Sequence, residues 1–357
     1  MSSEMLKRAD ISIRAEQAND LAERYPRILE KLSQDTGFVP TKEIGRSTWW
    51  GKKVGAVIFR GIFEKDTPAV LKIEALKMQP DEITEKTMIQ HAKKALEGSG
   101  IRPPNVYEEI PWTDEDGGYS AIIMEDVPTD SPVLPVPGTR EDIEALLAVR
   151  ERYRRALQEN HVVPWVAMDT SDKAQYLSHS VATKFASWRQ SRKEIFPTHP
   201  FSKPGDAALI DKAIAVLTQG YTGVAPEFQN GHFSHRDVVR VGDEIVLFSN
   251  LYWAWRAPFY DAVFPSHWYL YEVANVPDMT IEELERQRDM WNRHYNTMTE
   301  KLSPEEQRLF ALARIERYAA GLNLDALSIS DDPKNEIARY VVDQTRTDLT
   351  NALAEIF

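Results

Sequence analysis

The chain has 357 residues, of which 43 are basic and 55 acidic, with a net charge of −12 and no cysteine. This length is sufficient for two lobes with separate cores. The negative charge argues against nucleic acid or an anionic membrane as the main partner, and the lack of cysteine excludes disulfides and zinc–thiolate sites. No apolar run approaches the roughly 18 residues of a membrane-spanning helix, and residues 1–10 are too polar for a signal peptide, so we expect a cytoplasmic protein.

The first third of the sequence predicts a helix followed by a small antiparallel sheet. Apolar residues recur at helical spacing between residues 13 and 32. A second helix is expected over residues 81–96. Strands are expected at 54–63, 69–73, 105–110 and 119–124, because apolar, partly β-branched segments there alternate with turn residues. We therefore expect an N-terminal helical extension over residues 1–37 and a sheet lobe with one main helix over 38–127.

The remaining residues, 128–357, are predicted to form a mostly helical lobe. A Pro-rich connector leads to Thr139, which starts a helix with a capping-box-like pattern. Further helices are expected at 171–194 and 206–219, and three N-cap residues mark later helix starts: Thr280, Ser303 and Asp332. Only residues 233–250 have strand-like patterning in this half. The sequence therefore predicts an α+β fold of two lobes.

Lys72 is the first candidate for chemistry. Its neighbours Leu71 and Ile73 are apolar, so alternation along the expected strand directs Lys72 to the opposite face of the sheet. A lysine on a rigid strand can hold two phosphates as a point charge. Glu82 and Glu85 of the following helix are both candidates for its acidic partner, and we favour Glu85. The alternative is an edge-strand lysine with its ammonium in water.

Two further segments suit a nucleotide. The segment at residues 45–48, which includes Gly45 and Ser47, lies between two expected strands and could place backbone N–H groups over phosphates. The strand that ends near residue 124 leads through Glu125 and Val127 into the connector. A backbone edge at this point could pair with an adenine ring.

The order of these motifs resembles the aminoglycoside phosphotransferase and choline kinase group of small-molecule kinases. The resemblance spans about residues 38–300 and is carried by Gly45-x-Ser47, Lys72, Glu85, Met124-Glu125-Asp126, His235-x-Asp237 and Trp255-x-x-Pro258-x-Tyr260-Asp261. It implies a protein-kinase-like fold that uses ATP and Mg²⁺. It also implies that Asp237, beside His235, is the catalytic base, and that Lys72 and Glu85 hold the nucleotide phosphates.

The segment after Asp237 departs from the family pattern. The family's magnesium-binding Asn should follow by five positions, where this chain has Gly242, and residues 237–248 are interpreted as two strands joined by a Gly-Asp turn. Ser249 and Asn250 stand where the family has a magnesium-binding Asp, so they are the candidate metal positions. Their side chains are neutral and therefore supply no negative charge to a metal ion. Asp243 is the nearby carboxylate that could substitute, and the turn is its expected role.

Six aromatic residues crowd the span that follows: Tyr252, Trp253, Trp255, Tyr260, Trp268 and Tyr269. An aromatic box could hold a quaternary ammonium group by cation–π contact. The alternative is a packed core under the last strand.

Three functions remain open from the sequence. The first is a phosphotransferase that moves the γ-phosphate of ATP to a hydroxyl of a small, hydroxyl-bearing or cationic substrate. The second is a pseudokinase that senses nucleotide or binds a protein partner without phosphotransfer. The third is an unrelated α+β protein, in which Lys72 and Glu85 should lie far apart. The first function requires a metal-binding carboxylate within reach of Asp237.

Overall fold

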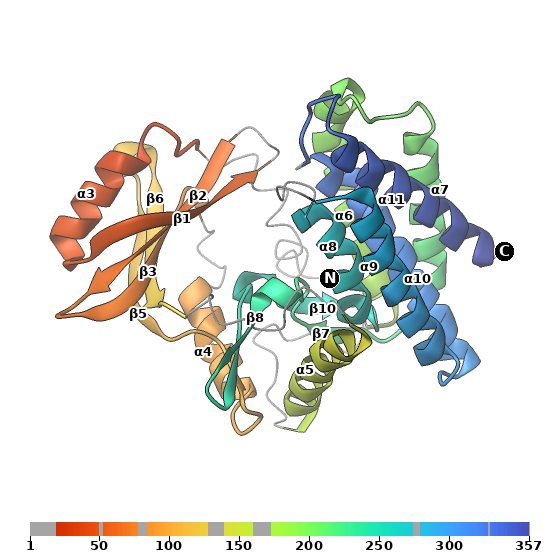
Figure 1. Ribbon diagram of the computed structural model, residues 1–357, viewed down its shortest axis with the longest axis horizontal. Coiled ribbons are helices and arrows are strands. Elements are labelled where there is room, and N and C mark those ends of the chain that lie inside the picture. Colours follow the sequence, from red (N-terminus) through yellow and green to blue (C-terminus); the bar gives the residue numbers. More distant parts are fainter. Residues whose placement is uncertain are drawn as a thin grey trace.

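The structure is a computed structural model that describes residues 19–49, 53–77, 84–127, 139–159, 173–273, 279–327 and 329–356. A sheet lobe and a helical lobe lie side by side, with helix α4 (Glu85–Ala95) and a short hairpin between them (Figure 1). The predicted α+β class and two-lobed arrangement are confirmed. Among the described helices, none combines the length and apolar character that a membrane crossing requires.

The sheet lobe is a five-stranded antiparallel sheet with strand order β1-β2-β3-β6-β5. Its strands are β1 (Val39–Trp49), β2 (Lys53–Phe63), β3 (Thr67–Glu74), β5 (Val106–Thr113) and β6 (Tyr119–Glu125). Helix α3 (Tyr25–Thr36) covers the outer face, where Ile28 and Leu32 pack with Leu71 and Ile73 in one core. The inner face carries Ile122, which packs with Ile89 of α4. Alternation along β3 therefore directs Lys72 to the inner face, as the sequence predicted.

A second, three-stranded sheet joins the two lobes, with strand order β4-β9-β8. β8 (Val238–Val241) and β9 (Glu244–Leu247) form the antiparallel hairpin expected from the Gly-Asp turn, and β4 (Ile101–Arg102) adds to β9 in parallel. Gly242 has a φ of 60°, a conformation that glycine adopts without steric cost. The predicted hairpin is thus confirmed, while its pairing with β4 was not foreseen.

The helical lobe contains α5 (Arg140–Glu159), α6 (Lys173–Ile195), α7 (Asp206–Gly220), α8 (Tyr260–Val273), α9 (Ile281–Thr299), α10 (Pro304–Asn323) and α11 (Glu336–Glu355). Thr280 caps α9, and Ser303 forms a full capping box at the start of α10, as the sequence predicted. Asp332 was the wrong cap for α11. That role belongs to Asn335, whereas the Asp332 carboxylate accepts the N–H of Lys334 in the turn before the helix.

One pair of strands in the helical lobe was missed. β7 (Glu227–Gln229) and β10 (Ala254–Arg256) are three residues each and pair antiparallel. Phe228 of β7 contacts Trp255 of β10 edge to face, with ring centroids 5.4 Å apart. Because this pair flanks the segment from Asn230 to Trp253, it fixes both ends of the loop and hairpin that carry the candidate site.

Candidate functional site

Lys72 lies between two carboxylates in the sheet lobe. Its Nζ is 2.9 Å from Glu85 Oε2 on α4 and 2.7 Å from Glu74 Oε1 on its own strand. Burial opposes the charge of Lys72, yet Glu74 and Glu85 together raise its pKa above the ordinary value. Burial also raises the pKa of Glu85, with Glu74 acting in the same direction. Lys72 and Glu85 thus form the predicted pair, which contradicts the alternative of an unrelated fold. Glu74 is a second partner of Lys72 that the sequence interpretation missed.

Asp237 ends a short 3₁₀ turn, His235–Asp237, immediately before β8. Its Oδ1 accepts a hydrogen bond from Ser249 Oγ at 2.5 Å. Its Oδ2 accepts from Ser234 Oγ at 2.7 Å and lies 3.0 Å from His232 Nδ1. Burial acts to raise the pKa of Asp237, but His232, Ser249 and Ser234 outweigh it and lower the pKa. The carboxylate is therefore held charged by hydrogen-bond donors on both of its oxygens.

The candidate metal positions face other partners. Ser249, in the left-handed region with φ 61°, directs its hydroxyl to Asp237. Asn250 is 2% exposed, and its amide donates to the Leu247 carbonyl at 3.1 Å and accepts from Trp253 Nε1 at 3.3 Å. Asn250 therefore supports the chain rather than facing Asp237.

Asp243, the carboxylate that the sequence offered as a substitute metal ligand, does not face Asp237. Asp243 is exposed in the hairpin turn, at the far end of a four-residue strand from Asp237, about 13 Å at about 3.3 Å per residue. Within the described residues there is no group of three or more His, Cys, Asp or Glu side chains that could hold a metal ion. Ser249 and Asn250 therefore offer Mg²⁺ no carboxylate beside Asp237. The carboxyl group of Glu272 does lie close to Asp237, because Ser234 Oγ donates to both, at 2.7 Å to Asp237 and 3.5 Å to Glu272.

A second buried carboxyl group lies beside Asp237, and sequence reasoning missed it. Glu272 near the end of α8 accepts from Trp268 Nε1 at 2.7 Å through Oε1. Its Oε2 lies 3.6 Å from His235 Nδ1 and 3.8 Å from Arg236 Nε, and it accepts no hydrogen bond from the described part of the chain. Burial raises the pKa of Glu272 to about 7, with Arg236 opposing and Asp237 adding to the effect. Burial lowers the pKa of His235 to about 4, so His235 is neutral near pH 7.

The aromatic cluster divides between core and site. Trp253, Tyr260 and Tyr269 are buried, and Trp255 packs against the core. Tyr252 and Trp268 instead flank His232, with ring centroids 4.7 Å and 4.9 Å from the imidazole. These two aromatic rings therefore position His232 against Asp237.

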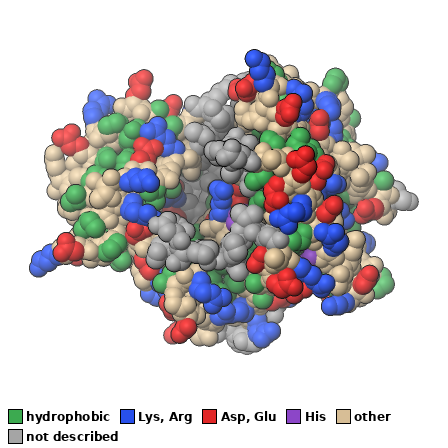
Figure 2. All heavy atoms as spheres, in the orientation of Figure 1, with side chains coloured by type: hydrophobic (Ala, Val, Ile, Leu, Met, Phe, Trp, Pro, Cys, Tyr) green, Lys and Arg blue, Asp and Glu red, His purple; other side chains and the backbone are tan. Residues whose placement is uncertain are grey.

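The two halves of the site meet at Tyr252. The 3₁₀ turn that contains it, Asn250–Tyr252, packs against α4. Although 41% of Tyr252 is exposed, the protein atoms around its hydroxyl raise its pKa, an effect to which Asp237 adds and which Lys72 opposes. Lys72 and Asp237 thus act on the same side chain from opposite lobes. Figure 2 shows a recess between the two lobes on the drawn face.

Ser47 and Glu125, the other candidates for nucleotide binding, both lie in the sheet lobe. Ser47 lies within strand β1 opposite Ala56 and is half-buried, so the expectation that residues 45–48 form a phosphate-binding segment between two strands is wrong. Residues 50–52 lie outside the described residues. The Glu125 carboxylate accepts two hydrogen bonds from Arg102, at 2.7 Å and 2.8 Å. Burial acts against that charge, but Arg102 holds the Glu125 pKa below its usual value. The Glu125 backbone N–H is also engaged, because it donates to the Asn105 carbonyl at 2.8 Å.

Val127 belongs to a small apolar cluster of the hairpin. It is buried with Val239 and Val246. Val70 and Met124 belong to a different cluster, on the inner face of the sheet. The side chain of Val127 is therefore part of the packing of the hairpin.

Comparison with known proteins identifies the fold. No family model matches the sequence, and no curated protein matches it. Among solved structures, a choline kinase from Cryptosporidium parvum Iowa II superposes with a TM-score of 0.53 at 11% identity, over 92% of this chain and 97% of that chain. A protein named as an aminoglycoside phosphotransferase from Ralstonia eutropha JMP134 gives 0.51 at 14% identity, over 92% and 97%.

A third similar structure was solved with a bound nucleotide analogue. An amicoumacin kinase in complex with AMP-PNP, Ca²⁺ and its substrate gives a TM-score of 0.49 at 15% identity, over 96% of both chains. Identities this low establish the fold alone. The two-lobed kinase-like fold that the sequence motifs resembled is thereby confirmed.

Proposed function

We propose that this chain is a nucleotide-binding pseudokinase of the small-molecule kinase fold. The observation that carries this proposal is the 2.5 Å hydrogen bond from Ser249 to Asp237. Ser249 stands where the resembled family has a magnesium-binding carboxylate, and its hydroxyl is committed to Asp237 as a donor. Mg²⁺ in such sites is bound through one or two carboxylates together with substrate phosphates, and position 249 offers a neutral hydroxyl instead. The site is therefore suited to remain charged and folded without magnesium.

Nucleotide binding is supported by the arrangement of Lys72. Its ammonium is fixed on a rigid strand by Glu74 and Glu85, which removes the entropy cost of ordering it when phosphate binds. The two carboxylates outnumber the single ammonium, so the attraction for a triphosphate is reduced. We expect weak binding, in the range that suits a sensor of millimolar nucleotide. In this role the output would be contact with a protein partner.

A slow phosphotransferase is the second candidate, favoured by one observation. The charges of Lys72 and Asp237 both act on the pKa of the Tyr252 hydroxyl, which supports a phosphate anchor and a base on the same side of the molecule. The acceptor would be a small hydroxyl-bearing or cationic molecule, as the names of the similar structures suggest. Losing the charge of magnesium removes several kcal/mol of transition-state stabilisation, and each 1.4 kcal/mol is about tenfold in rate. Turnover would therefore be slow.

The test is a thermal-shift titration with ATP, with and without Mg²⁺, because a ligand of the folded state raises the melting temperature by mass action. For the pseudokinase we expect a shift that Mg²⁺ does not change and that Lys72→Ala abolishes. A magnesium-dependent shift, with ADP release when amino alcohols or aminoglycosides are added, would instead establish the phosphotransferase. No shift at millimolar ATP would refute nucleotide binding.

Ser249→Asp and Ser249→Asn form a matched pair for the metal question. The Asp variant adds a carboxylate beside Asp237, whereas the Asn variant adds a neutral group of the same shape. We expect the Asp variant alone to acquire a magnesium-dependent ATP shift. If both variants behave alike, position 249 does not govern metal binding. The hydrogen bond from Ser249 to Asp237 would then no longer support the pseudokinase proposal.

A further inference from the structure

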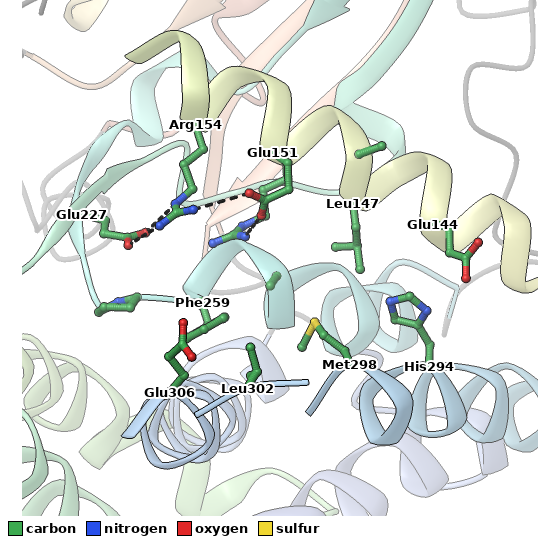
Figure 3. Close-up of a pocket in the computed structure, with 14 residues that line it drawn as sticks. Glu144, Leu147, Glu151, Arg154, Glu227, Phe259, His294, Met298, Leu302 and Glu306 are labelled. Atoms are coloured by element: carbon green, nitrogen blue, oxygen red, sulfur yellow. Dashed lines mark hydrogen bonds and ion pairs between the residues drawn. The ribbon is translucent and has the colours of Figure 1, made fainter. Parts of the chain in front are cut away.

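A pocket of about 460 Å³ lies in the helical lobe (Figure 3), and neither Lys72 nor Asp237 belongs to its lining. Helices α5, α8, α9 and α10 and strand β7 contribute its lining. None of the candidate nucleotide or metal residues belongs to that lining. We propose that this pocket binds a small amphipathic cation with an apolar body, a neutral oxygen acceptor and a protonated amine.

The middle of the pocket is apolar. Leu147 of α5 faces Met298 of α9 across it, and Phe259 and Leu302 lie beside them (Figure 3). The volume falls in the range of about 300 to 1,000 Å³ that is common for small-molecule sites. An apolar body that enters this space leaves water, which is the main favourable contribution to its binding.

Two buried nitrogen atoms in the lining lack partners. Arg150 is 5% exposed, and although its Nη1 donates to Glu151, its Nε has no hydrogen-bond partner within the described residues. The same holds for His294 Nδ1. A buried donor without an acceptor destabilises a protein, so an oxygen atom of a ligand next to Arg150 Nε would restore the missing hydrogen bond.

Phe259 adds an independent sign of a site. Its φ of 67° is uncommon for a residue with a bulky side chain, and such conformations persist where the surroundings enforce them, often at binding sites. The ring is held edge to face by Phe310, with centroids 5.8 Å apart. The strained backbone thus presents an aromatic ring to the pocket.

The charged side chains that line the pocket determine which ligand charge it favours. Four carboxylates line the pocket against two guanidinium groups: Glu144, Glu151, Glu227 and Glu306 against Arg150 and Arg154. Arg154 is already paired with Glu227 at 2.9 Å. This excess of negative charge disfavours a carboxylate ligand, so the acceptor for Arg150 should be a neutral oxygen.

The ends of the pocket favour an amine. Glu144 and Glu306 lie at opposite ends of the space in Figure 3. Glu144 Oε1 accepts from Arg140 at 2.8 Å, and Glu306 Oε2 accepts from the Ser303 hydroxyl at 2.7 Å. In each case the described bonds involve one carboxylate oxygen, so the second oxygen can accept an ammonium hydrogen.

The probes for the test are L-phenylalaninamide and 3-phenylpropanoate, measured by isothermal titration against the full chain. They share an apolar ring, but the first carries an ammonium and a neutral carbonyl, and the second a carboxylate. We expect the amide to bind at least tenfold more tightly. Equal or tighter binding of 3-phenylpropanoate would overturn the assigned ligand class, and no binding of either probe would overturn the site.

Two pairs of variants locate the binding. Leu147→Trp fills the pocket and should abolish binding of the amide, whereas Leu209→Trp, a half-buried leucine of α7, should leave it unchanged. Arg150→Lys keeps the charge but removes the Nε donor and should weaken binding several-fold. Binding that survives Leu147→Trp would overturn the proposal. Because no nucleotide is present, these results are independent of the pseudokinase proposal.

Discussion

The Glu272 carboxyl group should make the stability of this protein depend on pH. Its pKa is raised to about 7 by burial, from an ordinary value of 4.5. A raised pKa means that the folded protein binds the proton more tightly than the unfolded chain. This contribution to stability is therefore present at low pH and is lost as the pH rises from about 4.5 through about 7. Between pH 5 and pH 8 the two pKa values give a loss of about 2 to 3 kcal/mol in the free energy of unfolding.

Glu272→Gln resembles the protonated group and should remove this dependence. Urea unfolding of both proteins at pH 5 and pH 8 measures the difference, and contributions from other titrating groups cancel in the comparison. His235 is neutral in the folded protein at these pH values, because its pKa is lowered to about 4; its protonation in the unfolded chain affects both proteins equally and cancels in the comparison. From pH 5 to pH 8 we expect the free energy of unfolding of the variant to rise by about 2 to 3 kcal/mol relative to that of the wild type. If the difference in free energy of unfolding between the two proteins does not change with pH, the raised pKa of Glu272 is refuted.

Three further changes test other contacts by urea or thermal unfolding. Lys72→Ala should cost about 1 to 3 kcal/mol because it leaves the half-buried Glu85 without its ion pair, and adding Glu85→Gln should recover part of this loss; a cost below 1 kcal/mol would argue that the pair is solvated. Tyr153→Phe should cost about 1 to 3 kcal/mol, because it removes a buried hydrogen bond to Asp261; a neutral result would mean that water replaces the hydroxyl. Gly242→Ala should cost about 1 to 2 kcal/mol from backbone strain alone, since no atom lies within 4 Å of the added methyl group, and a larger cost would indicate that the turn is crowded.

Much of the fold followed from local patterns in the sequence. Alternation around Lys72 predicted which face of the sheet it occupies, and the caps at Thr280 and Ser303 predicted two helix starts. The strands β7 and β10 have three residues each, too few for a periodic pattern, and they form because pairing joins segments 25 or more residues apart. The cap at Asp332 failed because Asn335, three residues later, has the same capping chemistry.

The site was only half predictable. Lys72 and Glu85 follow an order of strand and helix that the sequence displays, so their pairing could be anticipated. Glu272 and His232 lie in a helix and a loop without a repeated pattern, and their roles arise from contacts across the fold. One signal was available for Glu272. It follows Trp268, Tyr269, Leu270 and Tyr271 on a helix with many apolar residues, where a lone carboxylate requires a specific partner.

The hydrogen bonds around Asp237 imply that a residue at position 249 that binds a metal would make the protein less stable when the metal is absent. Ser249, Ser234 and His232 keep Asp237 charged despite its burial. A second carboxylate at position 249 would lie within hydrogen-bond distance of Asp237, and without a cation one of the two would be forced to take up a proton. A chain that retained the metal ligand would thus be less stable whenever magnesium was absent. The serine gives a site that is stable without the metal, which is the condition under which a nucleotide sensor without phosphotransfer can operate.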